Sequence, residues 1–119
     1  MFQILQLSLD DSRRTLWDNF VKADQDGTFF HLAGWQRVLQ KTLGHPAFYL
    51  YAWSNEQIVG VLPLAWVKSA LFGNSLVSTP FCVYGGALGP VEVRRALEQK
   101  AIELGTELGV DQVELRYKK

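Results

Sequence analysis

The residue types best suited to chemistry gather in one segment of the chain, residues 78–90. It holds three of the ten glycines, two of the four prolines and the only cysteine. Gly85-Gly86-x-x-Gly89 stands just before a segment of helical spacing, and backbone N–H groups at such a turn can hold a phosphate or a carboxylate. The same glycines would equally let a strand turn tightly into a helix. The spacing matches neither a P-loop nor a dinucleotide fingerprint, so both interpretations stay open.

The nucleophile types in this segment have no base beside them in the sequence. They are Ser78, Thr79 and Cys82, and a hydroxyl or thiol needs a base or a lowered pKa to attack. A single cysteine has no partner for a disulfide or a zinc site, so we favour a small buried side chain for Cys82 over a nucleophile. His31 and His45 flank an expected helix, and no residues have metal-ligand spacing. We therefore assign no catalytic residue and no metal.

Composition and charge exclude several classes of function. The 119 residues, 48% of them hydrophobic, are enough for one domain with one core, residues 1–119. Twelve basic residues balance twelve acidic ones, so we expect no duplex nucleic acid or anionic membrane as a partner. The first residues lack a basic leader, and the longest nearly apolar run, 58–67, is about half of a membrane span. We therefore expect a cytoplasmic protein without a transmembrane segment.

The apolar spacing predicts the order strand, helix, helix, strand, strand, strand, helix, strand. We expect strands over residues 2–9, 47–53, 58–67, 75–81 and 110–117. We expect helices between capping residues 10–12 and a polar turn at 24–27, from 32 or 33 to about 43, and over 91–108. Pro63 predicts a bulge or a local break in pairing. A hairpin of antiparallel strands and a helix between the last two strands make this an α/β protein with a mixed sheet and flanking helices.

Several separated motifs together resemble a known family. They are Thr28-Phe29-Phe30-His31-Leu32-Ala33-Gly34-Trp35-Gln36-Arg37-Val38, Gly44-His45, Tyr49-Leu50-Tyr51-Ala52, Ile58-Val59-Gly60-Val61-Leu62-Pro63-Leu64, Lys68-Ser69, Leu71-Phe72-Gly73-Asn74 and Ser78-Thr79-Pro80-Phe81-Cys82-Val83-Tyr84-Gly85-Gly86. The chain resembles the amino-terminal part of FemAB-like proteins, most closely the FemAB-related group associated with exosortase and PEP-CTERM systems. The resemblance implies a GNAT-like fold, that of the acyl-CoA N-acyltransferases.

The resemblance also implies a function, and it implies that this chain corresponds to only one half of a family member. It implies an N-acyl- or aminoacyltransferase of cell-envelope or exopolysaccharide biosynthesis, whose donor would be an acyl-CoA or an aminoacyl-tRNA. Family members carry two GNAT-like halves, and this chain matches the first. We therefore expect the chain alone to hold no cofactor, to be inactive, and to self-associate through apolar surface that the second half would cover.

The same resemblance places an acceptor groove at the turn after the fourth strand. The residues expected to contact a small-molecule or envelope-precursor acceptor are Phe81, Cys82, Tyr84, Gly85 and Gly86, with His31 and Trp35 as additions. Bridge-forming members tend to have an arginine near this turn, where this chain has Cys82-Val83-Tyr84. A non-catalytic binding or assembly module is the alternative. A standalone acetyl-CoA-dependent acetyltransferase is disfavoured, because 83–89 lacks a Gln/Arg-x-x-Gly-x-Gly/Ala loop.

Overall fold

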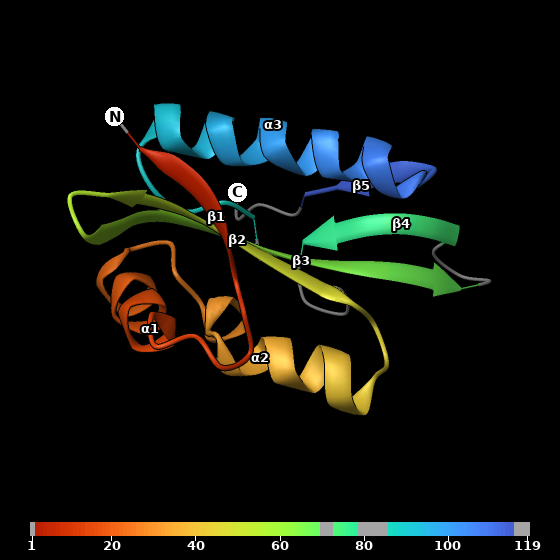
Figure 1. Ribbon diagram of the computed structural model, residues 1–119, viewed down its shortest axis with the longest axis horizontal. Coiled ribbons are helices and arrows are strands. Elements are labelled where there is room, and N and C mark those ends of the chain that lie inside the picture. Colours follow the sequence, from red (N-terminus) through yellow and green to blue (C-terminus); the bar gives the residue numbers. More distant parts are fainter. Residues whose placement is uncertain (1, 70–72, 79–85, 116–119) are drawn as a thin grey trace.

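The computed structural model describes residues 2–69, 73–78 and 86–115, and shows a sheet between two layers of helix (Figure 1). α1 and α2 cover one face of the sheet, and α3 covers the other. The strands are β1 (Gln3–Leu7), β2 (Ala47–Ser54), β3 (Gln57–Ser69), β4 (Gly73–Ser78) and β5 (Gln112–Glu114). The helices are α1 (Arg14–Ala23), η1 (Phe29–His31), α2 (Gly34–Arg37), η2 (Val38–Thr42) and α3 (Val91–Leu108).

The sheet is mixed, which confirms the expected fold class. Its strands lie in chain order, β1-β2-β3-β4-β5. The first three pairings are antiparallel, whereas β4 and β5, which α3 connects, are parallel. Among the described residues, no helix is long and apolar enough to cross a membrane.

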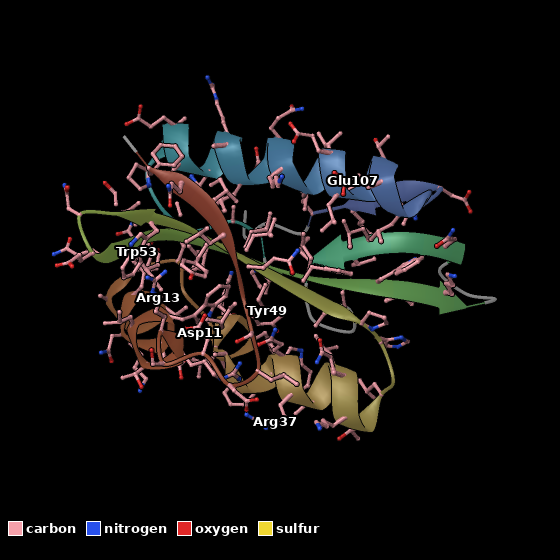
Figure 2. All side chains as sticks on the ribbon, in the orientation of Figure 1. Asp11, Arg13, Arg37, Tyr49, Trp53 and Glu107 are labelled. Atoms are coloured by element: carbon pink, nitrogen blue, oxygen red, sulfur yellow. The ribbon has the colours of Figure 1, made fainter. Side chains whose placement is uncertain are left out.

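The α1 face of the sheet carries a row of aromatic rings that explains how α1 is held. Trp17 of α1 is fully buried and stacks on Tyr49 of β2, with ring centroids 5.2 Å apart. The Arg13 guanidinium lies 3.7 Å from the Trp53 ring centroid and donates a 3.0 Å hydrogen bond to the Tyr51 hydroxyl (Figure 2). Such contacts between rings and between a cation and a ring add stabilisation beyond the buried area.

The start of α1 differs from the sequence prediction. Residues 10–12 were expected to cap the helix, but no side chain caps it, and Arg13 precedes its first turn. The Asp11 carboxylate instead accepts the Arg13 N–H at 2.8 Å. An aspartate side chain can accept a hydrogen bond from the backbone N–H two residues later, and this local turn competes with helix capping.

The β2–β3 hairpin forms as expected, through a two-residue turn. Asn55 and Glu56 both have positive φ, 50° and 60°, which is the conformation that matches the twist of paired strands. A register shift lies at Ala52/Trp53, so the bulge is not at Pro63, which pairs in register with Tyr49. On the β2 side the predicted break at Pro63 is therefore wrong.

The last elements match the prediction closely. α3 spans the expected residues, 91–108, and Gly109 closes it in the left-handed conformation, as the helix-terminating glycine predicts. The second helix is divided into α2 and η2, and one turn, η1, precedes it. β4 and β5 are described to Ser78 and Glu114, so the ends of the expected strands at 79–81 and 116–117 lie outside the described residues.

Candidate functional site at the carboxyl end of β4

β4 is the strand at which the sheet changes direction. It pairs antiparallel with β3 on one side and parallel with β5 on the other. In open α/β sheets, ligands bind beyond the carboxyl ends of the strands. The residues at these ends are Ser78 of β4 and Glu114 of β5, which pairs with Val77. The carboxyl end of β4 is therefore the candidate site.

Beside this end, the pairing along β3 changes partner. Ser78 pairs with Leu64, and the next described partner on that side of β3 is Leu88. The Val61 N–H donates to the Leu88 carbonyl at 3.1 Å, and the Leu88 N–H donates back at 2.9 Å. We call the interval between Ser78 and Leu88 the β4 break.

Pro63 stands in the middle of the β4 break. N–H groups of a strand point alternately to its two neighbours, so the Pro63 nitrogen faces the same side as the Val61 N–H. Proline has no hydrogen to donate, and no described residue pairs with it on that side. The β3–β4 register would place Thr79 opposite Pro63, and Thr79 lies outside the described residues, so on this side the interruption at Pro63 stays a prediction.

The glycines around the β4 break allow Leu88 to reach β3. Gly89 has φ 129°, and a Cβ built on it would lie 2.7 Å from the Val59 carbonyl oxygen. A Cβ on Gly60 would lie 2.9 Å from the Leu88 carbonyl oxygen and collide with Val93. Tight packing of strand and helix, one of the two interpretations of the glycine-rich segment, therefore applies to Gly89.

His31 connects η1 to the far side of the β4 break. Its Nε2 lies 2.9 Å from the Gly86 carbonyl oxygen, and its Nδ1 lies 3.1 Å from the Thr28 nitrogen. The Thr28 N–H can only donate, so Nδ1 accepts and Nε2 carries the hydrogen that Gly86 receives. Burial lowers the pKa of His31, and the bond to Gly86 opposes this. The ring is 2% exposed, so it acts as a neutral structural link.

A second set of contacts fixes the segment that carries His31. The buried Trp17 indole donates to the His31 carbonyl at 2.6 Å. Arg14 donates to Gln36 Oε1 at 2.6 Å and to the Ala33 carbonyl at 2.7 Å. These bonds join α1 to η1 and α2, so the position of Gly86 is set by residues far away in the sequence.

Three aromatic rings beside His31 form the exposed part of the site. Phe29, Phe30 and Trp35 pack edge to face, with centroids 5.5, 5.6 and 6.3 Å apart. Phe29 is 66% exposed, and the buried Trp35 indole nitrogen has no hydrogen-bond partner among the described residues. We call these three residues the aromatic cluster. It offers apolar contact area beside His31, which contacts Gly86.

Glu114 is a site residue that the sequence analysis missed. Val113 packs on the α3 side, against Gly105, and side chains of a strand alternate between faces. Glu114 therefore points to the face on which His31 and the aromatic cluster lie. A carboxylate there can accept a proton. The alternation of apolar and charged residues over 113–115 could have indicated that Glu114 faces away from α3. A charged residue in a short strand is, however, usually exposed to solvent.

Of the seven residues predicted to contact an acceptor, the structure describes three. It brings His31 into contact with Gly86 and places Trp35 in the neighbouring aromatic cluster. Phe81, Cys82, Tyr84 and Gly85 lie outside the described residues. Within the described ranges, no three His, Cys, Asp or Glu residues could hold a metal ion together.

Comparison with known proteins identifies the fold. No protein-family model and no curated protein matches the sequence. A ribosomal-protein-alanine N-acetyltransferase from Brucella melitensis has a TM-score of 0.68 and 12% identity, over 100% of this chain and 82% of its own. A transcriptional regulator from Bacillus halodurans has a TM-score of 0.65 and 14% identity, over 100% and 83%.

The third structural neighbour is AAC(6')-Iy in complex with the bisubstrate analogue CoA-S-monomethyl-acetylneamine. It has a TM-score of 0.64 and 15% identity, over 99% of this chain and 80% of its own. At these identities the likeness concerns the fold. The chain therefore has the GNAT fold, that of N-acetyltransferases.

Proposed function

We propose that this chain is the acceptor-binding, amino-terminal GNAT-like unit of a FemAB-like N-acyl- or aminoacyltransferase of cell-envelope or exopolysaccharide biosynthesis. The observation that carries the proposal is the β4 break, where the partner of β3 changes from Ser78 to Leu88 beside the strand that pairs parallel with β5. The GNAT fold and the resemblance of several motifs to those of FemAB-like proteins support it.

The reaction joins an amine to an activated acyl group. The amine nitrogen attacks the acyl carbonyl, a C–N bond forms, and the bond to a thiol or a ribose hydroxyl breaks. Most of the acceleration comes from holding the two groups together and from donors to the developing oxyanion. We assign Glu114 as the group that takes the proton from the amine, because it is a carboxylate at the carboxyl end of β5, beside β4.

The acceptor rests on the aromatic cluster in this proposal. Phe29 is exposed and lies next to His31, which holds Gly86. Aromatic side chains contribute large apolar contact areas to binding sites. The acceptor is then an amine with an apolar or ring-shaped body, and Phe81, Cys82, Tyr84 and Gly85 complete its contacts, as the resemblance implies.

The donor is an acyl-CoA or an aminoacyl-tRNA. The structural neighbour with a CoA-linked analogue makes acyl-CoA the first donor to test. The two donors differ in size and charge, so direct binding assays separate them.

Acceptor binding tests the proposal without requiring a second half. Amino sugars, lysine and alanyl peptides are titrated into the chain, and binding is measured by calorimetry. We expect Phe29→Ala to weaken binding about 10-fold, the loss of one aromatic contact. Leu16→Ala is the matched control, because it truncates an exposed apolar side chain that lies on α1, outside the aromatic cluster. Equal binding by both variants, or no binding by any amine, would refute the assignment.

Acyl transfer by the full-length protein tests the role of Glu114. Glu114→Gln should lower kcat/KM by a factor of about 10²–10⁴, the usual contribution of a general base. Glu107→Gln changes an exposed glutamate of α3 in the same way and should leave the rate unchanged (Figure 2). A rate that is the same in both variants would remove Glu114 from the mechanism.

A non-catalytic assembly module is the second candidate function. The 66% exposure of Phe29 within a packed cluster favours it, because exposed aromatic clusters often contact other proteins. Sedimentation separates the two candidates: self-association that Phe29→Ala abolishes, without amine binding, would support the module.

A further inference from the structure

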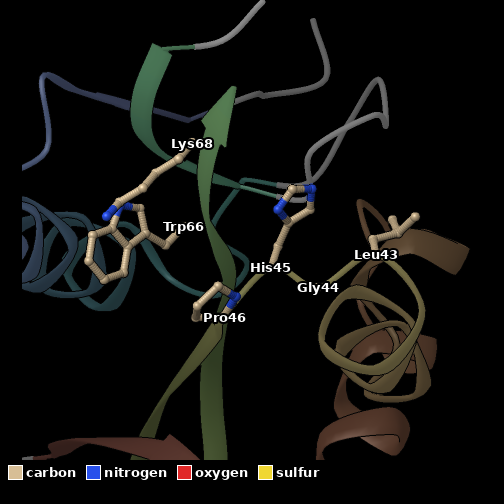
Figure 3. Close-up of a pocket in the computed structure, with 6 residues that line it drawn as sticks. All are labelled: Leu43, Gly44, His45, Pro46, Trp66 and Lys68. Carbon is tan, nitrogen blue, oxygen red and sulfur yellow. The ribbon is translucent and has the colours of Figure 1, made fainter. Parts of the chain in front are cut away.

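A pocket at the carboxyl end of β3 lies apart from the β4 break. Its volume is about 280 Å³, and it opens where η2 gives way to β2 (Figure 3). Leu43, Gly44, His45, Pro46, Trp66 and Lys68 line it. Lys68 pairs with Asn74, at the opposite end of β4 from Ser78. At about 3.3 Å per residue, four residues of β3 put Lys68 about 13 Å along the strand from Leu64.

The charge in this pocket is positive. The Lys68 ammonium lies 4.4 Å from the Trp66 ring centroid, and the His45 ring lies on the other side of β3 (Figure 3). No carboxylate is among the lining residues. The Trp66 indole donates to Asn74 Oδ1 at 2.7 Å, which fixes the ring plane. The pocket thus combines an oriented aromatic ring with groups that attract an anion.

The backbone of β3 adds a donor at the same place. β2 begins at Ala47, opposite Ala65, and the Trp66 N–H reaches the Pro46 carbonyl at 2.8 Å. Because N–H groups two residues apart point the same way, the Lys68 N–H faces the pocket side, beyond Pro46. No described residue accepts it there. A carboxylate or phosphate oxygen could.

We propose that this pocket binds a small organic anion, a carboxylate or a phosphate on a flat or apolar body. The Lys68 ammonium and the Lys68 N–H contact the anionic group, and charge-assisted hydrogen bonds of this kind are the strong ones. Pro46 contacts the apolar body, which lies along the edge of the Trp66 ring. The proposal is independent of the acyl-transfer function.

Titration by ¹H–¹⁵N NMR tests this site with phenyl phosphate, benzoate, inorganic phosphate and benzyl alcohol as probes. We expect saturable shifts of the Trp66 indole and the Lys68 amide with phenyl phosphate or benzoate, with a Kd of about 1 mM or below. The comparison of these two probes tells which anion the pocket prefers. Inorganic phosphate tests the need for the apolar body, and benzyl alcohol the need for charge.

A pair of charge variants decides whether Lys68 makes the site. Lys68→Gln should raise the Kd at least about 10-fold, the loss of one charge-assisted bond. Lys100→Gln removes an exposed lysine of α3 and should leave the Kd unchanged. Equal loss in both variants, no saturable shift with either aromatic anion, or equal affinity for benzyl alcohol would overturn the proposal. Inorganic phosphate binding as tightly as phenyl phosphate would overturn the part played by the apolar body.

Discussion

The described pairing of β3 changes at two places, and the contacts at the two places differ. On the β4 side, Leu88 takes up the pairing at Val61, and His31 fixes Gly86 from the facing helical layer. On the β2 side, the strand ends at Ala47 and leaves the pocket lined by Trp66 and Lys68. The first place is filled by close backbone packing, and the second is left open. Substitutions should therefore affect stability at the β4 break and binding at the pocket.

The largest effect on stability is expected at Gly89. Gly89→Ala puts a Cβ close to the Val59 carbonyl oxygen at a φ of 129°, so strain and overpacking should together cost about 2–5 kcal/mol. Gly109→Ala is the matched control, because Gly109 also has positive φ but no atom within 4 Å of an added Cβ; it should cost about 1–2 kcal/mol. Urea unfolding measures both, and similar losses would mean that the return of Leu88 to β3 is not tightly packed.

The loss of the His31 link is expected to come next. His31→Gln cannot satisfy both Thr28 and Gly86 with the same geometry, and a buried unsatisfied polar group costs about 1–3 kcal/mol. The corresponding change at the pocket, His45→Gln, should cost less, because His45 is less buried than His31. Free energies of unfolding that fall equally in the two variants would abolish the contrast between the two regions.

The same link gives stability a pH dependence of defined sign. Burial lowers the pKa of folded His31 below the ordinary value of 6.5, while Asp24 raises it more weakly. The unfolded chain therefore binds the proton more readily, so the contribution of His31 is present above pH 6.5 and is lost as the pH falls from there through the folded pKa. The slope is at most about 1.4 kcal/mol per pH unit. Unfolding at pH 8, 6 and 5 should show it in the natural chain and not in His31→Gln; equal slopes would contradict this.

The smallest effect on stability is expected at the pocket. Lys68→Gln should change the free energy of unfolding by less than about 0.5 kcal/mol, because Lys68 is exposed and its contact with Trp66 is weak. The same variant should weaken binding of phenyl phosphate. A loss of stability above 1 kcal/mol, roughly twice the usual surface effect, would show that this region is structural as well.

The fold could be predicted from sequence where the spacing of apolar residues agrees with the glycine and polar residues that end helices and form turns. α3 was predicted at its observed bounds because its apolar stripe ends at Gly109, and the hairpin turn at 54–57 was predicted from its polar residues. The division between α2 and η2 was not predicted, since its apolar spacing fits one continuous helix. The capping by residues 10–12 was wrong because Asp11 forms a local turn with Arg13 instead.

The site was harder to predict because it depends on which segments meet. Motifs in the sequence suggested His31 and Gly86, but nothing local showed that the ring would hold this carbonyl from 55 residues away. Pro63 predicted a break without indicating the side of β3, and on the β2 side it pairs in register with Tyr49 instead. Glu114 became a candidate only when the pairing of β5 with β4 placed it.

One measurement tests the central claim most directly: mapping, by ¹H–¹⁵N NMR, where an acceptor amine binds. The amine with the highest affinity in calorimetry is titrated, and the shifts of backbone amides are assigned. We predict that the largest shifts fall on Phe29, Gly86, Leu88 and Glu114, around the β4 break. Shifts confined to His45 and Lys68, or spread evenly over the chain, would contradict the claim that the carboxyl end of β4 is the acceptor site.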